Sequence, residues 1–186
     1  MQDISRFTTE RLTILQRDED IADRLLTFYN ENREEFEQFD PLLSDNFYTE
    51  KYQRAVIRYE RDEIEKGLAN HYYVYLGDDT DTIIGNIDFF RIRPNPFYST
   101  ILSYRFHHDY WGKGYAYEAI RASIKMMFDN YDIHRVEARI STDNPRSIKL
   151  IEHLGFTYEG IEHESVKIRD VFKDHMRYSL LSTAEF

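Results

Sequence analysis

The chain has 186 residues with no cysteine, and 34 acidic against 24 basic residues give it a formal net charge of −10 at pH 7. Its length predicts one domain, residues 1–186, with a sizeable core. The missing thiols exclude disulfides, thiolate zinc sites and an acyl-cysteine intermediate, and the negative charge disfavours binding to nucleic acid. No stretch has the apolar length of a signal peptide or a membrane span, so we expect a cytoplasmic protein that does not bind membranes.

The first part of the sequence predicts a strand and then two helices. Residues 11–17 alternate apolar and polar side chains, as a half-buried strand does, and residues 18–32 have apolar side chains at helical spacing. A second helix is predicted between Thr49, a suitable N-cap, and Gly67, a stop signal. The apolar stripe of this helix is Tyr52, Ala55, Val56, Tyr59 and Ile64.

An acidic stretch lies between the two predicted helices. Its carboxylates, opposed only by Arg33, are Glu31, Glu34, Glu35, Glu37 and Asp40. A charge run of this kind is most often a solvated helix end. The alternative is an electrostatic lip that guides a cationic N-terminus or a polyamine towards a groove.

The rest of the chain predicts an antiparallel meander followed by alternating helices and strands. Residues 72–76, 83–92 and 99–106 have strand patterns, and a helix with an apolar stripe continues to Tyr131. A strand at 135–140, a helix at 144–155 and strands at 156–161 and 171–181 complete the pattern. The predicted fold is α/β (α+β), with a mixed, mostly antiparallel central sheet of about six to seven strands and helices on both faces.

The segment "DYWGKGYAYEAI", Asp109 to Ile120, places two of the seven glycines around a lysine at the start of a helix. Successive backbone N–H groups at such a start, with the positive end of the helix dipole behind them, suit a diphosphate. Lys113 adds a positive charge. An ordinary turn is the alternative, and the spacing matches neither a Walker loop nor the G-x-G-x-x-G of a dinucleotide site.

A second segment with strong local signals is "NPRSIKLIEHLGF", Asn144 to Phe156. Asn144 suits an N-cap, Pro145 the first helical position, and Gly155 the residue after the helix. By itself this segment indicates only a well-capped helix with one buried face.

Together, in this order and at this distance, the two segments resemble the GNAT superfamily of acetyl-CoA-dependent N-acetyltransferases. "WGKGYA" (111–116) is similar to the pyrophosphate-binding motif Q/R-x-x-G-x-G/A, with Trp111 where Gln or Arg is usual. The stretches at 8–17, 133–160 and 174–181 resemble the subgroup that acetylates the N-terminal alanine or serine of ribosomal proteins. The resemblance is weakest from Asn30 to Asn70, where the family shapes its acceptor groove.

The resemblance implies the GNAT fold, acetyl-CoA as cosubstrate and a set of contacts to it. Backbone groups near Phe106 and His107 would hold pantetheine, the glycine turn would hold the diphosphate, and Asn144 and Ser147 would face the thioester. The implied contacts are Phe106, His107, Trp111, Gly112, Lys113, Gly114, Tyr115, Ala116, Asn144 and Ser147. Ile151 stands where many members have the tyrosine that protonates the leaving thiolate.

Without cysteine, direct attack of an amine on the acetyl-CoA carbonyl is the expected chemistry. An α-amine, with a pKa of about 7.7 to 8.0, is partly neutral at pH 7, whereas lysine spends about 4 to 5 kcal/mol to lose its proton. The subgroup resemblance favours Ser147 as the acid. For the base, Glu118, Glu159 and Glu162 are candidates, with Glu159 preferred, and each has solvated surface as the alternative.

Three functions remain open. The leading one is acetylation of a protein α-amine by a monomer or homodimer. Small-molecule amines such as a polyamine, an amino acid or an aminoglycoside are the alternative substrates, and a non-catalytic acyl-CoA-binding sensor is the third reading. A metal is not expected, because there is no H-E-x-x-H pattern and because His107 and His108 would point to opposite faces of a strand.

Overall fold

A computed structural model describes residues 4–184, within which eight strands form one sheet in the order β1-β2-β3-β4-β5-β6-β8-β7. Only β5 and β6 are parallel neighbours, so the mixed, mostly antiparallel sheet is confirmed. The sheet has one strand more than expected, because residues before the first predicted strand pair with it. The strands are β1 (Arg6–Thr8), β2 (Leu12–Leu15), β3 (Asn70–Leu76), β4 (Gly85–Arg93), β5 (Ser99–Phe106), β6 (Arg135–Ser141), β7 (Thr157–Ile168) and β8 (Val171–Leu181).

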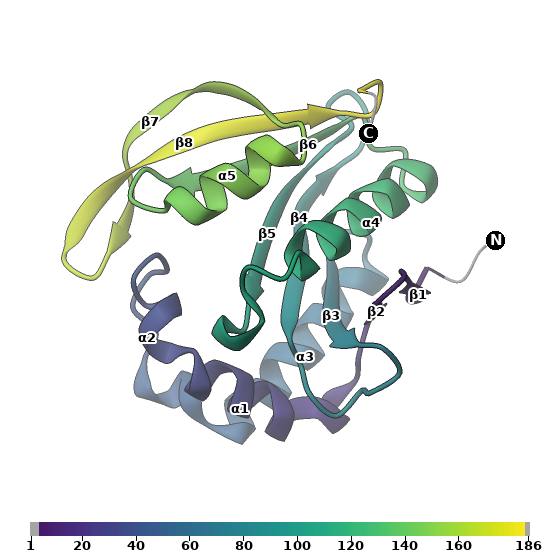
Figure 1. The fold of residues 1–186 in the computed structure, drawn as a ribbon, viewed down its shortest axis with the longest axis vertical. Helices are drawn as coiled ribbons and strands as arrows, with labels where there is room; N and C mark the ends of the chain where they lie inside the picture. The colour runs from purple at the N-terminus through teal and green to yellow at the C-terminus, as the bar shows by residue number, and fades with distance from the viewer. Residues whose placement is uncertain (1–3, 185–186) are drawn as a thin grey trace.

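Helices cover both faces of this sheet (Figure 1). The α-helices are α1 (Ala22–Glu31), α2 (Arg33–Phe36), α3 (Glu50–Glu65), α4 (Tyr115–Asn130) and α5 (Pro145–His153). Three 3-10 helices are η1 (Glu19–Ile21), η2 (Asp45–Tyr48) and η3 (His108–Tyr110). No helix among residues 4–184 has the length and apolar content needed to cross a membrane.

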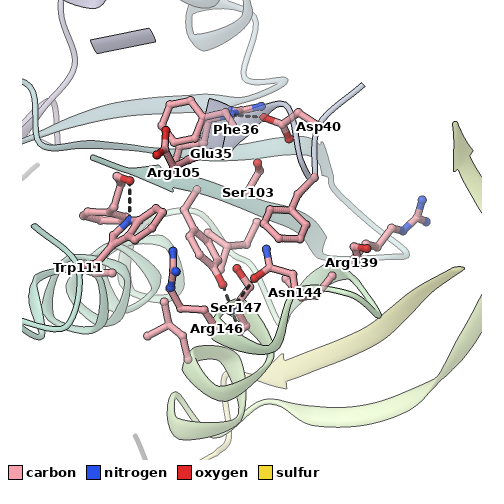
Figure 2. Close-up of a pocket in the computed structure, with 18 of the residues that line it drawn as sticks. Glu35, Phe36, Asp40, Ser103, Arg105, Trp111, Arg139, Asn144, Arg146 and Ser147 are labelled. Carbon is pink, nitrogen blue, oxygen red and sulfur yellow. Dashed lines mark hydrogen bonds and ion pairs between the residues drawn. The ribbon is translucent and has the colours of Figure 1, made fainter. Parts of the chain in front are cut away.

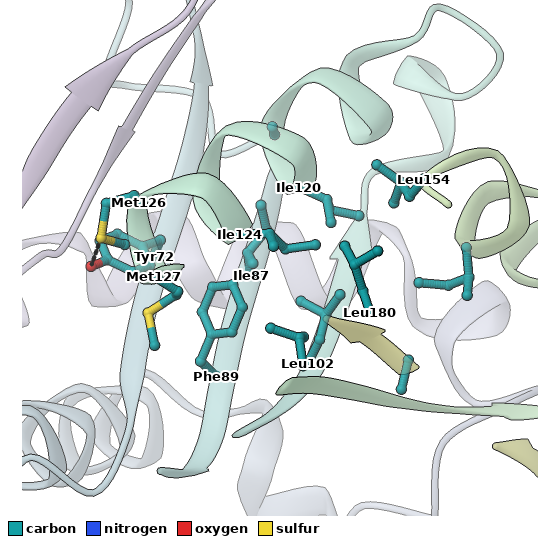
Figure 3. Close-up of a cluster of buried hydrophobic side chains, with 14 of the residues drawn as sticks. Tyr72, Ile87, Phe89, Leu102, Ile120, Ile124, Met126, Met127, Leu154 and Leu180 are labelled. Carbon is teal, nitrogen blue, oxygen red and sulfur yellow. Dashed lines mark hydrogen bonds between the residues drawn. The ribbon is translucent and has the colours of Figure 1, made fainter. Parts of the chain in front are cut away.

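The side-chain alternation of β3 shows how the two faces are built. Tyr72 and Val74 belong to the core under α4 and α5, which Figure 3 shows, whereas Tyr73 and Tyr75 belong to a second core under α1 and α3. Successive side chains of a strand point to opposite faces, so one strand contributes to both cores. The sheet therefore separates the two cores.

Helix α3 begins and ends as predicted but buries a different face. Thr49 is its N-cap, with Oγ1 accepting from the Tyr52 N–H, and Gly67 follows its end with a φ of +67°. The buried positions are Gln53 and Ile57, whereas Tyr59 of the predicted stripe is exposed. The predicted face was wrong because α3 packs polar groups against the sheet. A prediction based on the spacing of apolar residues does not detect such groups.

The parallel pair β5 and β6 separates along its length. The pairing runs from Ser99 opposite Arg135 to Leu102 opposite Ala138, and beyond those residues β6 continues only beside β8. The second half of β5 therefore has a free edge facing β6, and this gap positions the site described next.

Candidate active site

A pocket with a volume of about 210 Å³ lies in the gap between β5 and β6. Figure 2 shows Glu35, Phe36 and Asp40 on one side of it and Asn144 and Ser147 on the other. Trp111 and Ala116, from the glycine turn and the start of α4, complete the second side. The pocket thus brings the two sequence motifs and the acidic stretch together.

The free edge of β5 directs backbone groups into this gap. The His107 N–H donates to the Ile84 carbonyl at 2.9 Å, which fixes the alternation of the antiparallel ladder with β4. Tyr104 and Phe106 therefore turn their backbone groups towards β6. The Phe106 carbonyl accepts from the Trp111 indole N–H at 2.8 Å, whereas the N–H groups of Tyr104 and Phe106 meet no acceptor within residues 4–184.

The glycine turn has the conformation that an anion cradle needs. Gly112 and Gly114 have φ values of +72° and +81°, and the space around the missing Cβ of Gly112 is open to 4 Å. Among residues 4–184, no acceptor is bound by the backbone N–H groups from Gly112 to Ala116. These groups sit at the N-terminus of the 16-residue α4, so dipole and donors act together.

Arg11 fixes this turn from the side. Its guanidinium bonds Glu118 of α4 at 2.7 Å and donates to the Lys113 carbonyl at 3.0 Å. Burial alone would raise the pKa of Glu118, but hydrogen bonds from Thr9 and Arg11 outweigh it and lower that pKa. Glu118, a candidate base in the sequence, is thus held as an anion in a structural contact.

The start of α5 forms the opposite wall. The Asn144 side chain accepts from the Ser147 N–H at 3.1 Å, as the capping pattern predicts. Ser147 lines the pocket, and its side chain lies within hydrogen-bonding reach of Tyr104, which lines the same pocket. The Arg146 guanidinium lies 3.4 Å from the centre of the Trp111 ring, a cation–π contact across the pocket.

The two neighbouring histidines do not point apart, so that prediction was wrong. Strand β5 ends at Phe106, and the rings of His107 and His108 stack with centroids 4.7 Å apart in the following turn. The N–H of His107 is used in the sheet, and its Nε2 lies 3.1 Å from Glu31. Both observations remove His107 from the surface that faces the gap.

Most of the acidic stretch is engaged in ion pairs. Glu31 contacts His107, Glu37 accepts from Arg33 at 2.8 Å, and Asp40 accepts from Arg105 at 2.6 Å. Glu35 lines the pocket and has no ion-pair or hydrogen-bond partner among the described residues. Glu35 is therefore the carboxylate of the acidic stretch that lines the pocket without an ion-pair partner among the described residues.

Glu159, the preferred base in the sequence, lies outside the pocket. Its carboxylate accepts from Arg135 and, at 2.8 Å, from the Ser179 hydroxyl. The Arg135 hydrogen bond, with Ser179 and the charge of Arg177, lowers the pKa of Glu159 to about 2. Glu162 is paired in the same way with Arg139 and Arg177, at 3.5 and 3.6 Å. The lowered pKa makes Glu159 a poor base near neutral pH, and Glu162 is engaged with two arginines.

Replacing Glu159 with glutamine is therefore expected to leave kcat/KM within about threefold of the wild-type value. The substitution removes partly exposed ion pairs, which contribute about 1 kcal/mol or less. Steady-state thiol release at pH 7 measures the effect. A drop of 100-fold in kcat with an unchanged KM for acetyl-CoA would restore Glu159 as the base.

Two clusters of metal-ligand side chains occur in the described residues. In each, the ligand atoms lie within 4.8 Å of one another: His107, His108 and Asp109 form one, and Glu60, His71 and Asp88 the other. In the second, His71 contacts Asp88 at 2.9 Å and Glu63 at 3.3 Å through its two ring nitrogens. Hydrogen bonds thus already occupy both nitrogens.

Sequence reasoning missed several pocket residues. Arg105 and Arg139 occupy strand positions that the sequence pattern assigns to ordinary surface. The pattern places Tyr104 in the core, but its hydroxyl donates to the Ser147 carbonyl at 3.4 Å. His175, on β8, was passed over because a lone histidine in an alternating strand carries no signal. Arg146 had a weak signal, its place inside the Asn144 capping motif.

Comparisons with known proteins agree with this geometry. The sequence matches the family described as "Acetyltransferase (GNAT) domain" over residues 11–157. It is 32% identical over 161 residues to the probable N-acetyltransferase YjcK of Bacillus subtilis (strain 168), covering 87% of this chain and 88% of that protein. It is 30% identical over 177 residues to the ribosomal protein uS5-alanine N-acetyltransferase of Escherichia coli (strain K12), covering 94% and 90%.

The structure of ribosomal-protein-S5-alanine acetyltransferase from Vibrio fischeri has the same fold. Its TM-score is 0.90 at 24% identity, over 96% of this chain and 97% of that chain. The resemblance noted in the sequence is confirmed at the level of the family. The chain belongs to the GNAT acetyltransferase family and is an N-acetyltransferase.

Proposed function

We propose that this enzyme transfers the acetyl group of acetyl-CoA directly to the N-terminal α-amine of a protein, such as a ribosomal protein. The observation that carries the proposal is one pocket that joins the glycine turn and the start of α5 to an acidic wall. Solved relatives with this fold contain acetyl-CoA or CoA. The cytoplasm is the compartment that goes with such an acceptor.

The proposed contacts to acetyl-CoA are assigned to backbone N–H groups that have no acceptor among the described residues. Diphosphate fits the N–H groups from Gly112 to Ala116, with Lys113 as an added positive charge. Pantetheine fits the edge of β5, where Tyr104 and Phe106 present N–H groups to the gap. The thioester end then lies beside Asn144 and Ser147, which line the same pocket.

The acceptor side of the pocket suits an amine that arrives as a cation. Glu35 offers an unpaired carboxylate there, whereas Asp40 is already bound to Arg105. Removing the proton of a protein α-amine costs about 3.5 kcal/mol less free energy than removing the proton of a lysine. The Ser147 hydroxyl is the proposed proton donor to the departing sulfur, in place of the tyrosine that Ile151 replaces.

A small-molecule amine is the second candidate, because the same free carboxylate would bind a polyamine. Glu35 does not by itself distinguish a peptide N-terminus from spermidine, since both are cations. A protein that binds acetyl-CoA without acetylating any amine would be the sensor.

Thiol release from acetyl-CoA with a panel of amines tests the proposal. The panel consists of short peptides beginning with Ala, Ser or Thr, the same peptides N-terminally blocked but containing lysine, and spermidine. The absence of cysteine from the chain removes any thiol background. We expect turnover with free N-termini only. Turnover restricted to spermidine would transfer the assignment to small amines, and binding without turnover would favour the sensor.

A further inference from the structure

We propose that His175 is the general base, accepting the proton of the amine at its Nε2 directly or through one water. The inference rests on the proposed function, acetylation of an amine bound in this pocket. Apart from Glu35, the carboxylates at or near the pocket are held in ion pairs. His175 lines the same pocket, and its ring nitrogen Nε2 has no partner among the described residues.

His175 is buried against the acceptor side of the pocket. Only 6% of its surface is exposed, yet its ring lines the pocket. On β8 the side chains of Tyr178 and Leu180 enter the core under α4 and α5. The alternation of the strand therefore turns His175 to the opposite face, beside its register partner Ser141, which also lines the pocket.

The contacts of the ring allow the tautomer that a base requires, in which Nδ1 donates to a carbonyl oxygen. Nδ1 lies 3.2 Å from the Lys173 carbonyl and 3.1 Å from the Ser165 hydroxyl. A carbonyl oxygen only accepts, so Nδ1 carries the proton in this contact. The neutral ring then has its lone pair on Nε2, for which residues 4–184 supply no partner.

The competing carboxylates are excluded by their contacts. Asp40 is bound to Arg105, Glu162 to Arg139 and Arg177, and Glu159 lies outside the pocket. Glu35 remains free, but a carboxylate ionises near pH 4 and an imidazole near pH 6.5. A base works best when its proton affinity is close to the operating pH, so the imidazole is better matched.

The proton balance is complete without a further reactant. The amine cation first loses one proton to Nε2, which releases it to solvent. Its nitrogen then bonds the acetyl carbon while the carbon–sulfur bond breaks. As the amide forms, the second proton of the nitrogen passes to the Ser147 oxygen while the Ser147 hydroxyl proton moves to the departing sulfur, so the serine is regenerated and one proton in total is released to solvent.

Charged groups of both signs surround the His175 ring, and their charges influence its protonation. On β8 these are Lys173 and Asp174, and the neighbouring strand β7 contributes Glu162 at the register position opposite His175. The pocket walls contribute Glu35, Asp40, Arg105, Arg139 and Arg146.

The test compares His175→Asn with the wild-type protein and with His163→Asn. The asparagine side-chain nitrogen can occupy the position of Nδ1, so it keeps a donor for the Lys173 carbonyl while the far part of the ring, with Nε2, is removed. His163, on the same hairpin, is 77% exposed and contacts Asp174, which makes it a matched control. Initial rates of thiol release with an Ala-starting peptide are measured from pH 6.5 to 9.5, together with acetyl-CoA affinity and thermal unfolding.

At pH 7 we expect His175→Asn to lower kcat by about 100-fold or more, the usual contribution of a general base. The KM for acetyl-CoA and the behaviour of His163→Asn should not change. The deficit should shrink above about pH 8, because the α-amine is then neutral without help. His175→Gln, which restores a polar group near the Nε2 position without basicity, should show the same deficit.

Two results would overturn the assignment. One is a His175→Asn enzyme within threefold of wild-type kcat at pH 7, and the other is a deficit that stays constant from pH 6.5 to 9.5. The wild-type rates report on the proposed function separately. Activity on spermidine alone would overturn the α-amine acceptor, while the same two variants would still decide the role of His175.

Discussion

Replacing Gly114 with valine is expected to weaken acetyl-CoA binding by at least about 100-fold. Gly114 has a φ of +81°, and a Cβ there would stand 3.3 Å from a guanidinium nitrogen of Arg11. The turn must therefore shift and rotate its N–H groups away from the diphosphate. Losing two hydrogen bonds to a charged group removes about 3 kcal/mol or more, and each 1.4 kcal/mol is tenfold in affinity. Isothermal titration with acetyl-CoA measures the change.

Gly67→Val is the matched control for this prediction. Gly67 also has a left-handed φ, +67°, but no atom within 4 Å of its missing Cβ, and it follows α3 rather than the glycine turn. Both variants carry about 1–3 kcal/mol of backbone strain, so both should melt earlier. Only Gly114→Val should lose the cosubstrate. If it binds acetyl-CoA as the wild type does, the diphosphate does not lie in the glycine turn.

The parts of the site that sequence reasoning anticipated are those with local signals. The Asn144 cap, Pro145 and Gly155 describe α5 within a dozen residues, and each meets a geometric requirement of a helix end. Gly112 and Gly114 similarly indicate a left-handed turn. Because these signals do not depend on the rest of the fold, they remain readable in a single sequence.

The parts that were missed depend on contacts between distant segments. Glu159 looked like a base until the fold brought Arg135 and Ser179 to it from two other strands. His175 became a candidate only because β8 lies beside β6 and turns it into the pocket. The residue pattern of one strand does not predict which charged side chains of a neighbouring strand will contact it.

The buried face of α3 illustrates the same limit for the core. An apolar stripe predicts burial of Tyr59, but the helix instead places Glu60 against Tyr73, whose hydroxyl donates to it at 2.7 Å. The second core thus has a polar cluster at its edge, made of Glu60, Glu63, His71 and Asp88. The stability of this cluster depends on hydrogen bonds and ion pairs between residues that only the fold brings together.

Replacing Asp88 with asparagine is expected to lower the free energy of unfolding by about 3–5 kcal/mol at pH 7, the usual effect of breaking a buried ion pair. Asp88 is 5% exposed, accepts from Asn86 at 2.7 Å and lies 2.9 Å from Nδ1 of His71. The variant leaves the charge of His71 without its main partner. Urea unfolding measures the difference. Asp129→Asn, which removes an exposed pair with Lys125, is the control and should change stability by less than about 1 kcal/mol.

The predicted effect of Asp88→Asn on the free energy of unfolding depends on pH in a definite direction. Burial alone would lower the pKa of His71, but Asp88, Glu60 and Glu63 outweigh it and raise the pKa from 6.5 to about 9. The resulting stability is fully present below pH 6.5 and is lost as the pH rises through 9. Burial raises the pKa of Glu60 from 4.5 to about 7, which adds a loss of the same sign at lower pH. Wild-type stability should therefore fall from pH 6.5 to 9, and the gap to Asp88→Asn should narrow. A gap that stays constant across this range would show that Asp88 stabilises the fold without pairing with a charged His71.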